Sequence, residues 1–422
     1  MIDLADLIAA GHQLETRAAD PARDRVDDVV PGLIVAPKTA EAVAATLQWA
    51  GTNRRSVVIR GGGSKLEWGA RASSIDLLLD MSRLNRVLVH RPGDLTVTVE
   101  AGIRLRDLNA QLAPHAQWLA LDPAFAERAT VGGLLATNDS GPQRHRFGTP
   151  RDLVIGIQLA TTDGALSKAG GQVVKNVAGY DLSKVVSGSF GTLAAIVTAT
   201  FKLAPLPAAS ATIEVDGLSL DELVAVAGVI TSSQLEPVAF DVHVHHPAGA
   251  PAPEIGCLIR FASLPGVVEA EVVNASSRIA AVHQLFRVVS GSAEHELWAG
   301  HSRRPWDAPG TIVRAAWRPA ALKSALEQLI ASCQSAGFVL VGRVGIGAGY
   351  IRLPGDVTEQ AAALQRLRSP GAFGNVLVTR APVEMKAADS VWPESRSTAA
   401  LVAALKRELD PAGVLGAGRG PR

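Results

Sequence analysis

A run of three glycines flanked by polar side chains is the strongest chemical signal in this sequence. The run comprises Arg60, Gly61, Gly62, Gly63, Ser64 and Lys65, and it follows a β-branched stretch at residues 56–59. Because glycines lack Cβ atoms, consecutive glycines let several backbone N–H groups converge on one ligand. Arg60, Ser64 and Lys65 add positive charge and hydrogen-bond donors that suit phosphate. The run therefore predicts an anion-binding loop at a strand end; a flexible turn is the alternative.

Two further glycine-rich segments lie in the first half of the chain. One contains Thr130, Gly132 and Gly133 and continues to Gly141, and the other extends from residue 175 to Gly191. Backbone donors beside small polar side chains suit a long ligand that has a central pyrophosphate and two aromatic ends. No Gly-x-Gly-x-x-Gly with a suitably placed acidic residue and no phosphate loop ending in Gly-Lys-Ser/Thr occurs. This absence disfavours the ordinary dinucleotide fold.

Size and composition indicate a folded protein of about two domains, at about 150 residues per domain. The chain has 422 residues, of which 47% are hydrophobic and 19% are charged. The net charge of +1 and the lack of aromatic stacking platforms beside basic clusters argue against nucleic-acid binding. The two cysteines, Cys257 and Cys333, are too few for a four-thiolate iron–sulfur cluster.

The N-terminal residues do not have the pattern of a signal peptide. No apolar stretch reaches the roughly 18 residues that a membrane span requires. We therefore expect a cytoplasmic protein without a transmembrane segment, which can dock at the inner face of the membrane through partners.

Several predicted elements surround the glycine-rich segments in the first half. Thr39 caps a predicted helix at residues 40–50, with Gly51 as its stop. Strands are expected at residues 56–60, 75–81, 86–90, 95–100, 153–161 and 192–203, with a helix at 104–113 and a strand-to-helix entry at 130–138. Prolines at positions 205 and 207 indicate a domain boundary.

The second half alternates strands and helices. Ser219 and Glu222 form a capping-box pattern before a helix that reaches about residue 230. Strands at 238–245 and 256–262 can pair, and further strands are expected at 211–215, 311–317, 338–344, 349–353 and 375–383. Helices are expected at 267–282, 320–336, 358–367 and 397–409. The predicted fold class is α+β, with two antiparallel sheet units backed by helices in this half.

The glycine-rich segments together resemble the FAD-binding domain of the p-cresol methylhydroxylase (PCMH)/vanillyl-alcohol oxidase superfamily. Residues 60–69 and 175–181 are most similar to the FAD-binding subunits of bacterial glycolate oxidase. The resemblance covers most of the first half, and a weaker similarity extends to residues 405–419. It implies a two-lobed PCMH-type FAD-binding domain at residues 1–207 and an α+β cap domain over the flavin ring at 208–387. A C-terminal segment at 388–422 would return to the FAD-binding domain.

The resemblance also implies roles for individual residues. Gly61, Gly62, Gly63, Ser64 and Lys65 would hold the pyrophosphate, and Thr130, Gly132, Gly133, Asn138 and Ser140 would line the flavin ring and ribityl chain. Gly188, Gly191 and Val197 would lie towards the adenine, and Asp122 and Pro123 near the flavin. The remaining expected FAD contacts are Arg60, Trp68, Gly69, Thr137, Gly141 and Arg419. Covalent attachment in this superfamily often uses a histidine in the first loop; because this loop has none, we expect non-covalent FAD.

Two departures from the family pattern limit what the resemblance implies. Catalytic members carry a metal-binding signature similar to His-x-Gly-x-Gly-Asn-x-His, and residues 343–350 stand in its place, with Arg343 and Tyr350 instead of the histidines. These side chains do not replace imidazole as metal ligands, so no metal is expected. The family pattern near the C-terminus resembles Asn-Pro-Gly-Arg, and Gly416, Ala417, Gly418 and Arg419 stand in its place here.

Other candidate residues have two interpretations each. His243 and His245 share one face of a predicted strand, which suits a metal, although an exposed strand face is the stronger interpretation. Arg303 and Arg304 could receive a carboxylate substrate or lie on a solvated or subunit-contacting surface. For His145 we expect a phosphate-facing or surface role, and for Tyr180 a place in the core rather than a ligand contact.

Three hypotheses follow. The first is the FAD-binding subunit of a glycolate (D-2-hydroxy acid) oxidase or dehydrogenase complex. It would carry electrons between a catalytic flavoprotein subunit and an iron–sulfur subunit, with a small 2-hydroxy acid as substrate of the complex. The second is a stand-alone FAD-dependent oxidoreductase for another hydroxylated substrate. The third is a structural or regulatory subunit with a vestigial flavin site. No catalytic residue is assigned.

Overall fold

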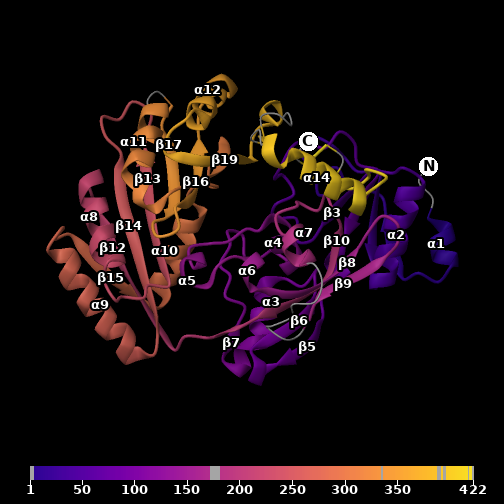
Figure 1. Cartoon of the computed structure of the whole chain (residues 1–422), viewed down its shortest axis with the longest axis horizontal. Coiled ribbons are helices and arrows are strands. Elements are labelled where there is room, and N and C mark those ends of the chain that lie inside the picture. Colours follow the sequence, from indigo (N-terminus) through magenta and orange to yellow (C-terminus); the bar gives the residue numbers. More distant parts are fainter. Residues whose placement is uncertain are drawn as a thin grey trace. The chain divides into compact units, whose positions relative to one another are not determined.

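The chain divides into two compact units in the computed structural model, which describes residues 4–171, 181–333, 336–386, 391–392, 396–416 and 418–420. The first unit comprises Met1–Ser140, Gly148–Leu206 and Lys386–Arg422 (Figure 1). The second unit comprises Gly141–Phe147 and Pro207–Met385. Helices and largely antiparallel sheets occur in both units, which confirms the predicted α+β class.

A four-stranded sheet in the first unit carries the glycine run at one strand end. Its order is β1 (Leu14–Arg17), β2 (Leu33–Pro37), β4 (Leu77–Asp80) and β3 (Val57–Arg60), and the last three strands are parallel. Helix α2 (Ala40–Thr52) begins as predicted, because the Thr39 side chain accepts a hydrogen bond from the Ala42 N–H. The helix does not stop at Gly51, where a Cβ atom would lie 2.7 Å from the Thr162 carbonyl oxygen. That glycine serves close packing instead.

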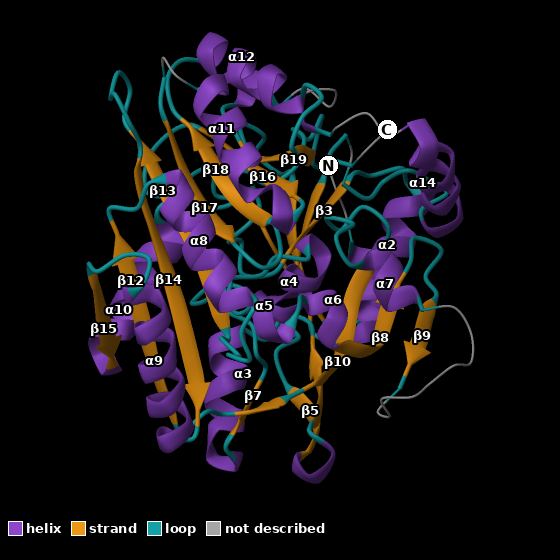
Figure 2. Ribbon diagram, turned by 60° about the vertical axis from the view of Figure 1, so that its left-hand side comes forward, coloured by secondary structure: helices purple, strands orange, loops and turns teal. Residues whose placement is uncertain are grey.

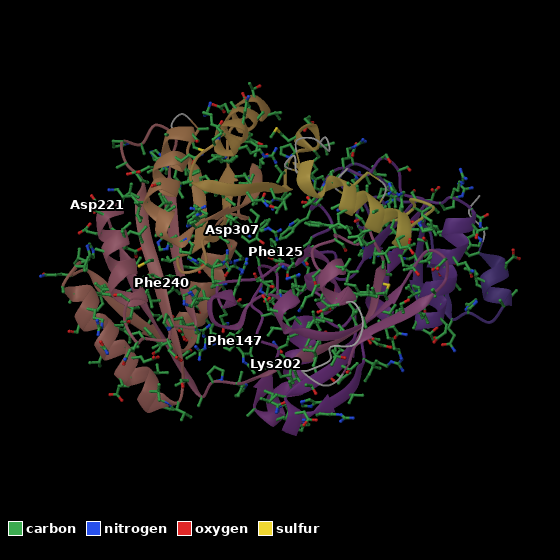
Figure 3. The ribbon with its side chains drawn as sticks, viewed as in Figure 1. Phe125, Phe147, Lys202, Asp221, Phe240 and Asp307 are labelled. Atoms are coloured by element: carbon green, nitrogen blue, oxygen red, sulfur yellow. The ribbon has the colours of Figure 1, made fainter. Side chains whose placement is uncertain are left out.

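A five-stranded antiparallel sheet is the other main sheet of the first unit. Its order is β5 (Val87–Arg91), β6 (Thr96–Glu100), β10 (Ala195–Lys202), β8 (Val154–Ala160) and β9 (Leu166–Gly170). Strand β10 begins later than predicted, because the N–H and the hydroxyl of Thr192 both donate to the Ser189 carbonyl oxygen and so extend the turn past Gly191. Figure 3 labels Lys202 at the end of this strand.

Shorter elements complete the first unit. They are α1 (Ala5–Ala9), α3 (Leu105–Leu112), β7 (Gln117–Trp118), α4 (Val131–Thr137), α6 (Pro150–Leu153), α7 (Leu182–Val186), β11 (Ala204–Pro205) and α14 (Arg396–Leu409). The chain after α14 joins β3, because the Val57 N–H donates to the Val414 carbonyl and the Gly416 N–H donates to the Val57 carbonyl. The C-terminal segment therefore lies beside the strand that leads into the glycine run.

One eight-stranded antiparallel sheet forms the centre of the second unit, where two separate sheet units were expected. Strand β13 (Ala239–His246) pairs with β17 (Phe338–Arg343) and thereby joins the two halves (Figure 2). The other strands are β12 (Ala209–Asp216), β14 (Glu254–Ser263), β15 (Phe286–Ser290), β16 (Thr311–Trp317), β18 (Ala348–Leu353) and β19 (Phe373–Arg380). The order is β15-β12-β14-β13-β17-β18-β16-β19.

The helices of the second unit are α5 (Arg144–Phe147), α8 (Leu220–Thr231), α9 (Pro265–Ala280), α10 (Gly291–Arg303), α11 (Leu322–Ser332) and α12 (Val357–Arg368). The capping box predicted for α8 is present: the Ser219 side chain accepts from the Glu222 N–H, and the Glu222 carboxylate accepts from the Ser219 N–H. The sequence did not predict α10 or β15. Within the described part of the chain, no helix is long and apolar enough to cross a membrane.

The eight-stranded sheet has one apolar and one polar face. Val242, Leu340 and Ile351 share the first face with other apolar residues. The other face carries Asp241, which lies opposite Arg343, and Tyr350, which lies opposite Arg314. Because side chains alternate along each strand and paired residues point the same way, each face keeps its character across neighbouring strands.

Gly342 tests the packing of the apolar face. A Cβ atom at this position would lie 2.7 Å from Cη2 of Trp317, which is buried. We expect Gly342→Ala to lower the free energy of unfolding by about 1–3 kcal/mol, because overpacking displaces the indole. Urea denaturation measures this change. Gly374→Ala is the matched control, since its Cβ would meet only the Ala316 oxygen at 3.9 Å. Equal stability of the two variants would contradict this packing.

Candidate functional site

A pocket in the first unit contains most of the glycine run. Segments distant in sequence form its wall: β3 and the run after it, α4, the turn before β10, and the C-terminal tail. Its lining residues are Val58, Ile59, Gly61, Gly62, Gly63, Ser64, Lys65, Leu66, Met81, Ala101, Thr130, Gly132, Gly133, Ala136, Thr137, Phe190, Gly191, Ala194, Ile196, Gly416 and Arg419.

The glycine run owes its shape to close contact with a second backbone segment. A Cβ atom on Gly61 would lie 2.1 Å from Oγ1 of Thr130, and one on Gly62 would lie 1.5 Å from the Arg128 carbonyl oxygen. Gly63 differs, because its φ is +69° and the nearest atom to a Cβ is 3.8 Å away. Two of the three glycines are therefore required for packing, and the third is required for a left-handed backbone.

The run leaves its backbone donors available. The N–H groups of Gly61, Gly62, Gly63 and Ser64 donate no hydrogen bond to any residue that the structure describes. All four residues line the pocket. Consecutive backbone N–H groups without partners form a concavity that suits an anion, since a buried N–H otherwise loses its hydrogen bond with water.

The two cations of the run are already paired. Arg60 donates to Asp24 and Asp80, each at 2.6 Å, and it is not part of the pocket lining. The Lys65 ammonium lies 3.1 Å from the Asp139 carboxylate, and both side chains are buried. Neither cation therefore brings an uncompensated charge to the pocket.

Arg419 brings an uncompensated positive charge to the pocket. Its side chain is buried, and Nη2 donates to the carbonyl oxygens of Leu66 at 2.7 Å and Trp68 at 2.5 Å. Its Nη1 is buried without a hydrogen-bond partner among the described residues. Burial lowers the pKa of Arg419, and the nearby Asp27 carboxylate opposes this effect. Because an unpaired buried charge is costly, an anion in the pocket would stabilise this arrangement.

The pocket also has an apolar part suited to a flat ring. Val58, Met81, Ala101 and Ile196 contribute hydrophobic side chains to its lining. Free backbone donors, one buried guanidinium and an apolar wall fit a ligand that combines a pyrophosphate with an aromatic ring. The residues present therefore fit a flavin dinucleotide.

Eleven of the predicted contacts line this pocket. They are Gly61, Gly62, Gly63, Ser64, Lys65, Thr130, Gly132, Gly133, Thr137, Gly191 and Arg419. The pocket lining does not include Arg60, Trp68, Gly69, Asp122, Pro123, Asn138, Ser140, Gly141, Gly188 or Val197. Residues 172–180, which include the start of the third glycine-rich segment and Tyr180, lie outside the described residues.

The residues outside the lining have other environments. Val197 packs in the core beside Leu47 and Leu79, while its neighbour Ile196 lines the pocket, because adjacent strand residues point to opposite faces. Gly188 lines a separate cavity of about 600 Å³. The Asn138 side chain accepts from the Arg151 N–H at 3.2 Å. Trp68 supports the pocket indirectly, because its carbonyl oxygen accepts from Arg419.

Sequence reasoning missed the apolar lining. Met81, Ala101, Phe190 and Ile196 read as ordinary core residues in sequence, and only their position around the glycine run distinguishes them. The alternation of side chains along a strand could have predicted that Ile196 and Val197 lie on opposite faces of the sheet. Phe190 has a φ of +57°, but a positive φ at a phenylalanine carries no sequence signal.

The glycines of residues 343–350 and nearby have packing roles in the second unit. A Cβ on Gly345 would lie 2.7 Å from the His145 ring, and one on Gly349 would lie 3.2 Å from Trp317. His145 is half-buried and packed against this turn, and burial lowers its pKa. Its expected phosphate-facing or surface role stays a prediction. The Arg343 guanidinium lies 5.7 Å from the centre of the Tyr350 ring.

The two candidate metal-ligating histidines have different environments. His243 is 5% exposed, and its Nε2 lies 3.0 Å from Oδ1 of Asp216, whereas His245 is exposed. The expectation of an exposed strand face is wrong for His243, because β13 is an interior strand and His301 of α10 contacts the ring. Across the described residues, no group of three or more His, Cys, Asp or Glu side chains could hold a metal ion.

The fold and the pocket define a flavin-binding protein, and comparison with known proteins agrees. Residues 31–170 match a family described as "FAD binding domain", which confirms FAD as the expected cofactor. The fold resembles that of alkyldihydroxyacetonephosphate synthase, with a TM-score of 0.69 over 92% of this chain and 77% of that one. At 18% identity, this likeness shows the fold alone.

Several relatives are oxidoreductases by name. D-2-hydroxyglutarate dehydrogenase of Xanthomonas citri pv. viticola is 35% identical, over 53% of this chain and 49% of that protein. Glycolate oxidase subunit GlcE of Escherichia coli K12 is 32% identical, over 47% and 55%. Glycolate oxidase subunit GlcD of Bacillus subtilis 168 is 27% identical, over 50% and 45%. The chain thus spans about half the length of these curated relatives.

Gly63 provides a test of the glycine run as an anion site. Asn and Asp both tolerate a positive φ, and a Cβ at this position has room. We expect Gly63→Asp to weaken FAD binding about tenfold or more relative to Gly63→Asn, because only Asp places a negative charge beside the pyrophosphate. Fluorescence titration with FAD measures both affinities. Equal affinities would contradict this location of the pyrophosphate. Gly62 does not permit the same test, because any side chain there meets the Arg128 carbonyl.

Proposed function

We propose that this chain is an FAD-dependent oxidoreductase and serves as the FAD-binding subunit of a 2-hydroxy acid oxidase or dehydrogenase complex. In such a complex it carries electrons between a catalytic flavoprotein subunit and an iron–sulfur subunit. The observation that carries the proposal is a pocket lined both by N–H groups of the glycine run, which donate to no described residue, and by the buried Arg419. When bound, FAD supplies the hydride and electron-transfer chemistry.

The residues of the pocket have separate roles in this proposal. The N–H groups of Gly61, Gly62 and Gly63 donate to the pyrophosphate, and Arg419 supplies the compensating positive charge. The apolar side chains around Ile196 exclude water from the ring beside them. The loop lacks histidine and cysteine, which supports non-covalent binding. Lys65, neutralised by Asp139, orders the loop rather than supplying net charge.

The names of two relatives and the burial of the two cysteines support the proposed complex. Two of the matched proteins are named as subunits of glycolate oxidase. Cys257 and Cys333 are both buried, and burial raises the pKa of the Cys333 thiol to about 12. Such thiols are poor metal ligands, because the thiolate form is disfavoured. An iron–sulfur cluster that receives electrons from the flavin would therefore belong to another protein.

A stand-alone oxidoreductase is the second candidate. The pocket of the first unit favours it over a structural subunit with a vestigial flavin site, because a bound flavin can itself accept a hydride from a substrate.

Anaerobic spectroscopy of the purified chain tests these alternatives. We expect the absorbance of oxidised flavin, no bleaching by D-2-hydroxy acids when the chain is alone, and bleaching when the partner subunits are present. Rapid bleaching of the isolated chain would instead support the stand-alone oxidoreductase. A colourless protein whose melting temperature is unchanged by FAD would contradict both.

Arg419→Gln tests the charge in the pocket. We expect FAD affinity to fall about ten- to a hundredfold, because a charge-assisted hydrogen bond is worth about 1.5–3 kcal/mol. Equilibrium dialysis with FAD measures the change. Arg407→Gln is the control, since it removes the same charge from an exposed position on α14. If the two variants bound FAD equally, Arg419 would not be the counter-charge.

A further inference from the structure

Lys386 is a buried cation of the first unit that does not belong to the pocket lining. Its side chain is 1% exposed, and it begins the C-terminal segment of this unit. The ammonium donates to the Asp27 carboxylate and to the Glu67 carbonyl oxygen. The Lys386 carbonyl oxygen accepts from the Arg71 N–H at 3.2 Å. These contacts fix Lys386 against the stretch that follows the glycine run.

Two cations bind three consecutive carbonyl groups of this stretch. Lys386 donates to the Glu67 oxygen, while Arg419 donates to the oxygens of Leu66 and Trp68 on either side of it. Since consecutive Cα atoms are about 3.8 Å apart, the ammonium and the guanidinium lie within roughly 10 Å of each other. Burial lowers the pKa of Lys386, the Asp27 carboxylate opposes this effect, and the positive charge of Arg419 lowers the pKa further.

Asp27 is the buried carboxylate that acts on both cations. Its side chain is 3% exposed, and its ion pair is with Lys386. Its Oδ2 atom is buried without a hydrogen-bond partner among the described residues. Burial lowers the pKa of Arg419, and the charge of Asp27 opposes this effect. Without Lys386, the field of this carboxylate would therefore fall on Arg419 alone.

The buried charges of this cluster leave one positive charge in excess, because two cations share one carboxylate. The other charges close to the cluster do not alter this balance. Glu67 is exposed, so water and salt screen its carboxylate. Arg71 and Asp28 cancel each other through two hydrogen bonds of 2.6 Å. Charges out of contact with water act on one another more strongly, so the excess charge matters for a bound anion.

We propose that Lys386 is a positioning residue of the FAD site, which neutralises Asp27 and so leaves the positive charge of Arg419 to the pyrophosphate. Arg419 lines the pocket, whereas Lys386 and Asp27 do not, so they act on the ligand through Arg419. The inference rests on the proposed role of Arg419 as the counter-charge of FAD. It predicts that FAD affinity follows the net charge of the three buried groups.

Three variants of the full chain, titrated with FAD and followed by fluorescence, test this dependence on charge. Asp27→Asn keeps the size of the side chain and suits the φ of +55° at this position. We expect Lys386→Met to weaken FAD binding about fivefold or more and Asp27→Asn to leave it unchanged or strengthen it. The double variant, Asp27→Asn with Lys386→Met, has the same net charge as the unmodified chain and should bind FAD within about twofold of it.

Lys202→Met is the matched control, because it removes the same charge from an exposed position at the end of β10 (Figure 3). This control should bind FAD as the unmodified chain does. Circular dichroism of each variant gives the folded fraction, to which the affinities are referred. If Lys386→Met does not fold, Asp27→Asn and the double variant still test the inference, since neither contains a carboxylate at position 27.

A purely structural ion pair would give another pattern, because each single substitution breaks the pair. Weaker FAD binding by Asp27→Asn would therefore overturn the inference, and so would unchanged binding by Lys386→Met. Arg419→Gln separates these failures from a failure of the proposed function. If Arg419→Gln bound FAD normally, the role of Arg419 itself would be wrong. If Arg419→Gln weakened binding and Lys386→Met did not, only the role of Lys386 would be wrong.

Discussion

The pocket of the first unit depends on the close approach of two backbone segments, residues 61–62 and 128–130. The contact is possible only without side chains, since Cβ atoms at Gly61 and Gly62 would fall 2.1 Å and 1.5 Å from atoms of Thr130 and Arg128. These glycines meet the second segment on the side where a Cβ atom would stand, and their N–H groups donate to no residue that the structure describes. The same steric constraint thus shapes the loop and leaves it able to bind an anion.

Charge in the first unit is divided between paired and uncompensated cations. Arg60 and Lys65 are paired with carboxylates, and their side chains stabilise the local fold. Arg419 has a buried nitrogen atom without a hydrogen-bond partner among the described residues. Since burial makes an uncompensated charge costly, such a position points to a ligand more strongly than the number of basic residues in a loop does.

Much of the fold followed from sequence patterns, because most elements have strong local signals. The Thr39 and Ser219 caps began their helices as expected, and strand alternation identified β6 and β10. Helix α10 was missed, since Ser290 makes no side-chain cap and only Glu294, Trp298 and His301 are buried along it. The union of the expected sheets was also missed, because the β13–β17 pairing joins residues about a hundred positions apart, a distance over which local patterns carry no information.

The sequence by itself determined that a glycine-rich loop follows β3, and its resemblance to known FAD-binding domains indicated FAD as the cofactor, which the family match confirms. Only the tertiary structure decided which side chains serve that loop. Arg60 turns to Asp24 and Asp80, Ile196 rather than Val197 lines the pocket, and Arg419 enters it from the far end of the chain. The physical reason is that pairing of charges and burial depend on neighbours in space, whereas the sequence specifies only neighbours along the chain.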